Sequence, residues 1–202
     1  MSETALDRTA AWELLTEFTE SASLRKHALA VETCVRAYGE REAAARGLGA
    51  HEAAALVDLY GNTGLLHDFD YEKFPTQEEH PFVGNKILTE RGWPEEMRVA
   101  ILGHAEYSGT PRVTHLDKVL FACDELAGFL TACALVKPTK SIFDVEVAGV
   151  RKKMKDKAFA RAVKREDISD GAELLGLSVE EHVGNCLRAM QGRAEELGLA
   201  GS

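Results

Sequence analysis

Apolar side chains recur at intervals of three and four residues along most of the chain, which places them on one face of an α-helix. No stretch alternates apolar and polar residues in the manner of a half-buried strand. The pattern therefore predicts an all-α protein. We expect helices over residues 6–20, 23–39, 51–67, 81–91, 94–105, 114–136, 144–154, 157–164, 170–176 and 179–198.

Residues with a preference for helix starts support several of these boundaries. Asp7, Ser23 and Ser178 stand where N-caps are expected, and Ser178 begins an S-x-x-E capping box. Proline is favoured as the first helical residue, so the His80-Pro81 pair predicts a helix that starts there with His80 as its N-cap.

The size and composition of the chain indicate one folded unit. Its 202 residues, 45% of them hydrophobic, are enough for one domain with a buried core and a helical extension. The pattern shows neither an internal repeat nor a linker. We therefore expect a single compact helical bundle over residues 1–202.

The net charge, the hydropathy and the cysteines limit which partners and which cellular compartment we expect. A net charge of -9 argues against a protein that coats nucleic acid through a broad basic surface. No apolar run approaches the ~20 residues that cross a bilayer, and the N-terminal residues do not read as a secretion signal. The four cysteines form no CxxC pair, which is typical of reduced thiols. We expect a cytoplasmic protein without a membrane partner.

Six polar residues within predicted helices or at their ends are candidates for metal binding. All carry an imidazole or a carboxylate, a ligand set that suits Mn, Fe, Zn, Ni or Mg better than a soft metal. Because they come from five predicted helices, a metal would lie where those helices converge. The six residues are His27, His67, Asp68, His80, His104 and Asp124.

Each of these residues also has an ordinary structural interpretation. A single histidine on a helix is more often a packed or surface residue than a ligand, and Asp68 alone could form a turn. Asp124 lies within the apolar stretch KVLFACDELAGFL, where a buried carboxylate costs several kcal/mol unless it is paired or bound to a metal. An ion pair of Asp124 with Lys118 or Arg112 is the alternative to a metal.

The ordered set His, His-Asp, His, His, Asp on successive helices resembles the HD-domain superfamily of metal-dependent phosphohydrolases. The resemblance covers residues 22–135, which would form a metal-binding core, with residues 136–202 as a helical extension packed on it. It implies that His27, His67, Asp68 and Asp124 are the four core ligands. His80 and His104 match the branch of the family that binds two metals.

In that branch the aspartate of the HD pair bridges the two ions. The resemblance implies that His27, His67 and Asp124 hold one divalent metal ion, that His80 and His104 hold the other, and that Asp68 contacts both. Two such ions would present a bridging hydroxide to a substrate phosphoryl group. Asp68 is therefore expected to be a catalytic residue as well as a ligand.

The residues after the HD pair depart from the common family pattern. Many relatives continue with Ile-Gly, whereas this chain has HDFDYEKF. Asp70 could hold a histidine in one tautomer, or it could be a solvated loop residue. Lys73, displaced from the usual position, and Arg112 are the candidates for contacting a phosphate and complete the predicted catalytic set with Asp68.

Other polar residues receive weaker interpretations. Lys137 and Lys140 could return over the site in a loop, whereas the basic run 151–157 reads as a solvated face. Asp117 reads as a helix-start carboxylate. We expect His51, His115 and His182 to be structural or exposed.

The predicted function is hydrolysis of a small phosphorylated substrate, a nucleotide or a phosphomonoester, by a metal-dependent enzyme. The same ligands would serve a di-iron oxygenase of the branch that resembles inositol oxygenase, and a non-catalytic metal-stabilised helical module is the third alternative. The amphipathic C-terminal segment either packs on the core or forms the face of a homodimer.

Overall fold

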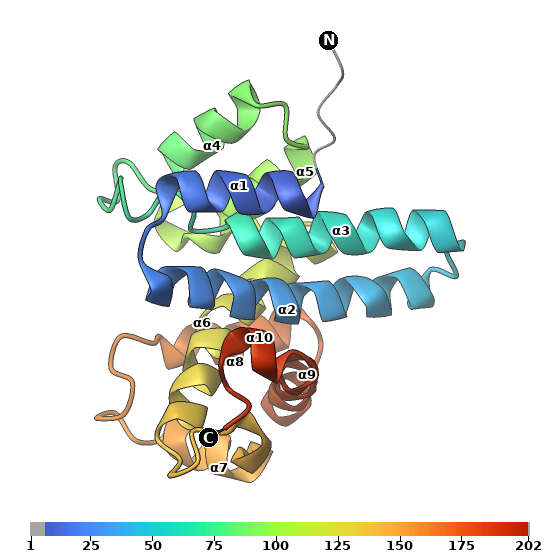
Figure 1. Cartoon of the computed structure of the whole chain (residues 1–202). Coiled ribbons are helices and arrows are strands. Elements are labelled where there is room, and N and C mark those ends of the chain that lie inside the picture. The colour runs from blue at the N-terminus through green and yellow to red at the C-terminus, as the bar shows by residue number, and fades with distance from the viewer. Residues whose placement is uncertain (1–6, 202) are drawn as a thin grey trace.

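Three helices that follow one another in the chain form a layer in the upper half of Figure 1. They are α1 (Arg8–Phe18), α2 (Ala22–Ala45) and α3 (Ala50–Leu66), and α3 packs against both of the others. A Cβ at Gly64 would lie 2.9 Å from the Cα of Glu32. Only glycine permits this approach, which presses the end of α3 against α2 where the candidate ligands begin.

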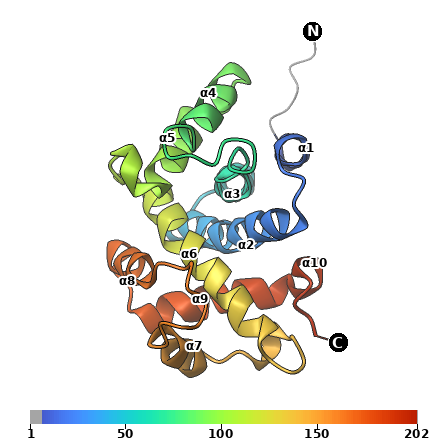
Figure 2. The same ribbon diagram turned by 90° about the vertical axis from the view of Figure 1, so that its left-hand side faces the viewer.

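Helix α6 (His115–Leu135) crosses this layer and connects it with the rest of the molecule (Figure 2). It contacts α2, and its apolar residues Leu120, Leu126 and Phe129 are fully buried. It also contacts three further helices, α5 (Glu95–His104), α8 (Arg165–Leu174) and α9 (Val179–Gly192). A capping box of Thr114 and Asp117 starts the helix. Asp117 therefore has the helix-start role that the sequence predicts, and Asp124 lies about two turns further along the buried helix.

The remaining elements lie on both sides of this framework. α8 packs on α6 so closely that a Cβ at Gly171 would lie 2.5 Å from the Cα of Ala122, and α9 packs on α2 and α6. Near the C-terminus, the amide of Ile142 donates to the carbonyl of Leu199 at 2.8 Å. These elements are α4 (Phe82–Glu90), α5 (Glu95–His104), the 3-10 helices η1 (Glu106–Ser108) and η2 (Ile142–Asp144), α7 (Val147–Met154), α8 (Arg165–Leu174), α9 (Val179–Gly192) and α10 (Ala194–Leu197).

The prediction of an all-α bundle is confirmed. The computed structural model describes residues 7–201, and within them ten α-helices pack around a shared apolar core with no strand. The predicted first helix starts at residue 6, which lies outside the described residues. Asp7 caps α1 as predicted, and Ser178 forms the predicted capping box with Glu181.

One predicted helix is wrong. Residues 157–164 form turns, and Ala160 has a φ of 40°, which a right-handed helix does not allow. The guanidinium of Arg165 binds the carbonyl oxygens of Phe159, Ala160 and Val163. An arginine side chain therefore satisfies carbonyl groups that helical hydrogen bonds would otherwise use, and α8 starts at Arg165 rather than at residue 170.

Three boundaries also differ from the prediction. Ser21 rather than Ser23 caps α2, because the Ser21 hydroxyl accepts from the amide of Leu24. His80 is not an N-cap, since its side chain is hydrogen-bonded to an aspartate and α4 starts after Pro81. The helix predicted over 179–198 is interrupted at Arg193, which separates α9 from α10.

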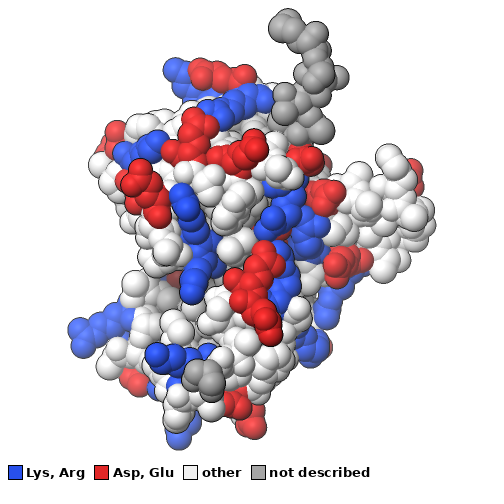
Figure 3. Space-filling model, in the orientation of Figure 1, with Lys and Arg blue, Asp and Glu red and all other residues white. Residues whose placement is uncertain are grey.

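Three features of the described residues relate to the expectations from charge, hydropathy and cysteine content. No helix between residues 7 and 201 has both the length and the apolar character that crossing a bilayer requires. The four cysteines, all within the described residues, are buried and unpaired. Lysine and arginine side chains are interspersed with aspartate and glutamate on the face of the molecule in Figure 3.

Candidate metal centre

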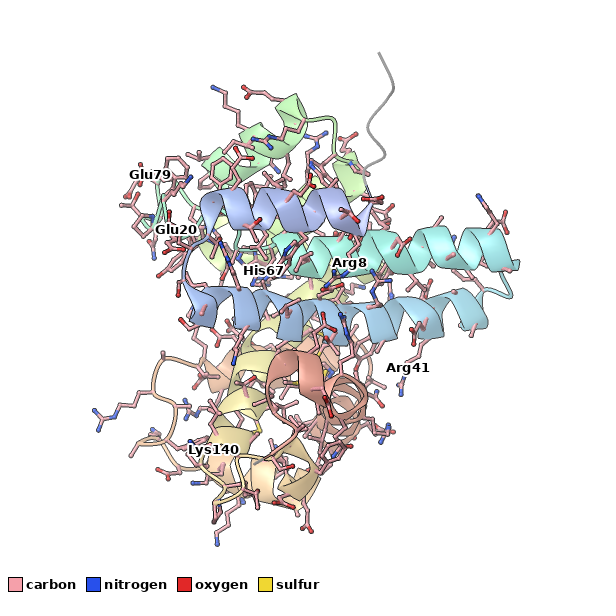
Figure 4. All side chains as sticks on the ribbon, viewed as in Figure 1. Arg8, Glu20, Arg41, His67, Glu79 and Lys140 are labelled. Atoms are coloured by element: carbon pink, nitrogen blue, oxygen red, sulfur yellow. The ribbon has the colours of Figure 1, made fainter. Side chains whose placement is uncertain are left out.

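The HD pair lies where α3 ends. His67 is the C-cap residue of α3, and Figure 4 labels it beside the end of that helix. Its Nδ1 donates to the carbonyl of Gly64 at 2.8 Å, so Nε2 is the nitrogen that faces Asp68 and Asp124. Nε2 is buried and lacks a hydrogen-bond partner among the described residues. A buried nitrogen without a partner is costly, and a metal ion would satisfy it.

The first group of candidate ligands consists of His27 from α2, His67, and Asp124 from α6. Oδ1 of Asp124 lies 3.1 Å from Nε2 of His27 and 3.4 Å from Nε2 of His67. Ligand atoms at ~2.1 Å from one ion lie about 3.0–3.5 Å from each other. The spacing of these three atoms therefore suits a shared metal ion.

The second group consists of Asp68, His80 and His104. Oδ1 of Asp68 lies 3.2 Å from Nε2 of His80 and 3.3 Å from Nε2 of His104. The other oxygen of Asp68, Oδ2, lies 3.3 Å from Nε2 of His67 in the first group. One carboxylate thus faces both groups, with one oxygen toward each.

Asp70 holds the imidazole of His80. Its Oδ1 lies 2.8 Å from Nδ1 of His80, and its Oδ2 accepts from the amide of Gly84 at 2.8 Å. A Cβ at Gly84 would lie 2.6 Å from Cγ of Asp70, so the carboxylate fits only against a glycine. Asp70 is fully buried, which decides between its two interpretations in favour of a histidine partner. His104 is held in the same way by the carbonyl of Ile101, which binds its Nδ1.

The histidines and carboxylates of the two groups stabilise each other's charges. Burial raises the pKa of Asp68, but His67, His104 and His80 outweigh it and hold that pKa well below its usual value. Burial likewise raises the pKa of Asp124, and His67 and His27 overcome it. Burial lowers the pKa of His80, yet its contacts with Asp68 and Asp70 raise it to about 9. A metal ion would compete with protons for the same nitrogen atoms.

A cavity of about 360 Å³ opens beside both groups. Four candidate ligands line it, namely Asp68, His80, His104 and Asp124. Its other walls include the rings of Tyr71, Tyr107 and Phe121, the carboxylates of Glu106, Glu125 and Asp167, and the ammonium of Lys164.

The sequence interpretation missed the residues that surround the ligands. Lys164 belongs to the segment 157–164, for which the sequence predicts a helix, and Tyr107 lies in the 3-10 helix η1, where its hydroxyl donates to the carbonyl of His80 at 2.9 Å. No spacing in the sequence connects either residue to the ligands. Only the packing of α8 and η1 against α6 and α5 brings them to the cavity.

The two cations predicted to take part in catalysis have other contacts. Nζ of Lys73 donates to the carbonyl of Glu17 at 2.8 Å and lies over the ring of Phe18. Nε of Arg112 donates to the carbonyl of Gly103 at 2.7 Å. Neither side chain is among the described residues that line the cavity. Their role in catalysis stays a prediction.

The remaining polar candidates lie outside the two groups. Asp124 contacts histidines rather than Lys118 or Arg112. Lys137 lines a separate cavity with Cys133, and Figure 4 labels Lys140 in the lower part of the molecule, away from His67. A loop that carries Lys137 and Lys140 back over the ligands, as the sequence suggested, is therefore wrong.

The three remaining histidines lie at structural or exposed positions, as the sequence predicts. His182 is buried between α2 and α6, the Nδ1 of His115 lies 2.9 Å from the hydroxyl oxygen of Tyr60, and His51 is exposed.

Comparison of the chain with known proteins identifies no relative. No protein-family model, curated protein or solved structure matches the chain. The fold and the site themselves establish a helical bundle in which two groups of histidine and aspartate side chains, spread along residues 27–124, could hold metal ions.

Proposed function

We propose that this protein is a metal-dependent phosphohydrolase of the HD-domain type, with two divalent ions, that acts on a small phosphorylated substrate. The observation that carries the proposal is the position of Asp68 between the two groups. Oδ1 faces His80 and His104, and Oδ2 faces His67. A carboxylate shared in this way is what a site for two neighbouring ions requires.

The residues of the chain would divide the work as follows. His27, His67 and Asp124 would hold one ion, His80 and His104 would hold the other, and Asp68, whose oxygens face both groups, would contribute to each. When bound, the two ions acidify a water molecule and neutralise phosphoryl charge. Six protein ligands spread over two ions leave coordination positions for water and substrate. Asp70, Gly64 and Ile101 fix the orientation of the imidazoles before any ion arrives.

The ligands and the cavity also indicate the kind of metal and of substrate. Four imidazoles with two carboxylates favour Mn, Fe, Zn or Ni over Mg, which prefers oxygen ligands. A cavity of about 360 Å³ lies at the low end of the range for small-molecule sites. The cavity size supports a phosphomonoester rather than a large nucleotide.

Metal content and phosphate release test the proposal together. Protein purified without chelator or affinity metal is compared with Asp68→Ala and His80→Ala, and with His51→Ala as a matched histidine control on the exposed face of α3. We expect two ions per chain in the wild type and in the control. Asp68→Ala should lower the affinity for both ions, and the His80→Ala protein should bind one ion fewer.

Release of phosphate from a panel of phosphomonoesters should require the metal and disappear in Asp68→Ala. A chain that binds no metal after reconstitution contradicts the proposal, and so does a single ion that is indifferent to His80→Ala. Two iron ions with oxygen consumption and no phosphate release would instead identify an oxygenase.

A further inference from the structure

The cavity has an acidic wall that the six candidate ligands do not use. Glu106 of η1, Glu125 of α6 and Asp167 of α8 line it from three different elements. Lys164 is the one lysine or arginine among the described residues lining this cavity, and its Nζ lies 3.9 Å from Oδ2 of Asp167. Together with Asp68 and Asp124, five carboxylates face one ammonium group.

The same cavity is lined by candidate metal ligands. Asp68 and Asp124 line the cavity and are the neighbours of the buried, unpartnered Nε2 of His67. The acidic residues of the cavity would offset much of the positive charge of two divalent ions bound there. The ions can neutralise a phosphoryl group, but nothing positive except Lys164 remains for a second anionic part of the substrate.

The acidic character continues beyond the cavity. A neighbouring hollow of about 480 Å³ shares Glu106 and Asp167 with it and adds Asp170 and Glu173. Arg112 also lines this hollow, but its guanidinium stacks 3.5 Å from the ring centroid of Phe121, and its Nε binds the carbonyl of Gly103. A substrate with a negatively charged tail would therefore meet like charges on this side, which costs binding energy.

Aromatic rings at the cavity suit a positively charged group. Tyr71 is 41% exposed and Tyr107 is 44% exposed, and both line the cavity with Phe121. The ring of Tyr71 packs edge-on against His80 at 5.3 Å between centroids, and the hydroxyl of Tyr107 binds the carbonyl of His80. Rings held in place beside carboxylates favour an ammonium ion through the cation–π interaction.

We propose that the substrate of this site is a zwitterionic phosphomonoester whose alcohol portion carries an ammonium group. The phosphoryl group would face the two His/Asp groups, and the ammonium group would face Glu106, Glu125, Asp167 and the aromatic rings. This inference rests on the proposed phosphohydrolase function. In the reaction, water oxygen forms the new P–O bond, the P–O bond to the alcohol breaks, and the leaving alkoxide takes up a proton.

Two isosteric substrates separate charge from shape. Phosphocholine and 3,3-dimethylbutyl phosphate differ by a quaternary nitrogen in place of a carbon. With the full, metal-loaded chain we expect kcat/KM to be about tenfold higher for phosphocholine, a difference of ~1.4 kcal/mol in line with one favourable cation site. Glu106→Gln with Asp167→Asn should abolish this preference, whereas Glu78→Gln on the exposed loop should leave it unchanged.

A binding measurement keeps this inference distinct from the proposed function. Calorimetry compares choline with 3,3-dimethylbutan-1-ol on the same metal-loaded protein, so it needs no turnover. Preferential binding of choline without hydrolysis of either ester would overturn the phosphohydrolase and leave the cation site standing. Equal binding of the two alcohols, or no binding of choline, would overturn the cation site whatever the turnover.

Discussion

At the scale of single residues, Asp70 lies outside the candidate ligands but holds one of them, His80, in place. Its carboxylate joins Nδ1 of His80 to the amide of Gly84, and it is buried. Asp70→Asn keeps the shape of the side chain but loses the charge and one acceptor. We expect affinity at the second group to fall about 10–100-fold, with the first group unchanged.

A metal titration that follows both binding steps measures this effect. Asp156→Asn is the matched control, because Asp156 is exposed and its side chain accepts from the backbone amide of Ala158, away from the candidate ligands. Equal weakening of both steps in Asp70→Asn would show that Asp70 supports the general fold rather than the orientation of His80.

The residues also show what sequence reasoning could and could not find. The six candidate ligands are recognisable because their types and order form a pattern in the chain. Asp70 was ambiguous, since a loop aspartate is buried or solvated according to its neighbours, and here Gly84 decides. Lys164 and Tyr107 have no pattern of their own, so only tertiary packing could reveal them.

At the scale of elements, the crossing of α8 over α6 positions the acidic side of the cavity. A Cβ at Gly171 would lie 2.5 Å from the backbone of Ala122. Gly171→Ala should therefore force the helices apart and lower the free energy of unfolding by about 1–3 kcal/mol, as overpacking does. Urea unfolding measures the change.

Gly149→Ala in α7 provides the control for helix propensity. Nothing lies within 4 Å of a Cβ at Gly149, so this substitution should stabilise the protein by up to ~1 kcal/mol. A Gly171→Ala protein as stable as the Gly149→Ala protein would mean that α8 can shift without cost.

Elements with long apolar patterns were predictable, and those shaped by single contacts were not. The long helices α2, α3 and α6 follow from their spacing of buried residues. The segment 157–164 also has apolar residues at helical spacing, but the contacts of Arg165 with its carbonyl groups keep it in turns. Periodicity describes burial and contains no information on such side-chain contacts to the backbone.

At the scale of the whole molecule, His182 connects three helices in the core. Its Nδ1 accepts from the hydroxyl of Tyr38 in α2, and its Nε2 donates to the carbonyl of Ala122 in α6. Burial lowers the pKa of His182 below its usual value. In the unfolded chain this histidine has an ordinary pKa of ~6.5. It therefore binds a proton at a higher pH in the unfolded chain than in the folded protein.

This difference makes stability depend on pH. The contribution of His182 should be fully present above pH ~6.5 and should be lost as the pH falls below that value, levelling off once the folded imidazole is also protonated. Urea unfolding between pH 5 and 8 compares the wild type with His182→Gln, whose amide can replace both hydrogen bonds, and with the exposed control His51→Gln. We expect His182→Gln to lose part of the acid sensitivity, and a slope equal to that of the control would contradict this.

The order of the candidate ligands along the chain has a consequence for biosynthesis. Asp68, His80 and His104 are all synthesised before Asp124 is added, and at that point His67 still lacks its partner in α6. The group of Asp68, His80 and His104 is therefore complete in the nascent chain before the other group. The group of His27, His67 and Asp124 is complete only when the middle of α6 has been synthesised. A nascent chain that captures an ion early would do so with Asp68 still free on the side of His67, so the shared carboxylate would be engaged before the core closes over it.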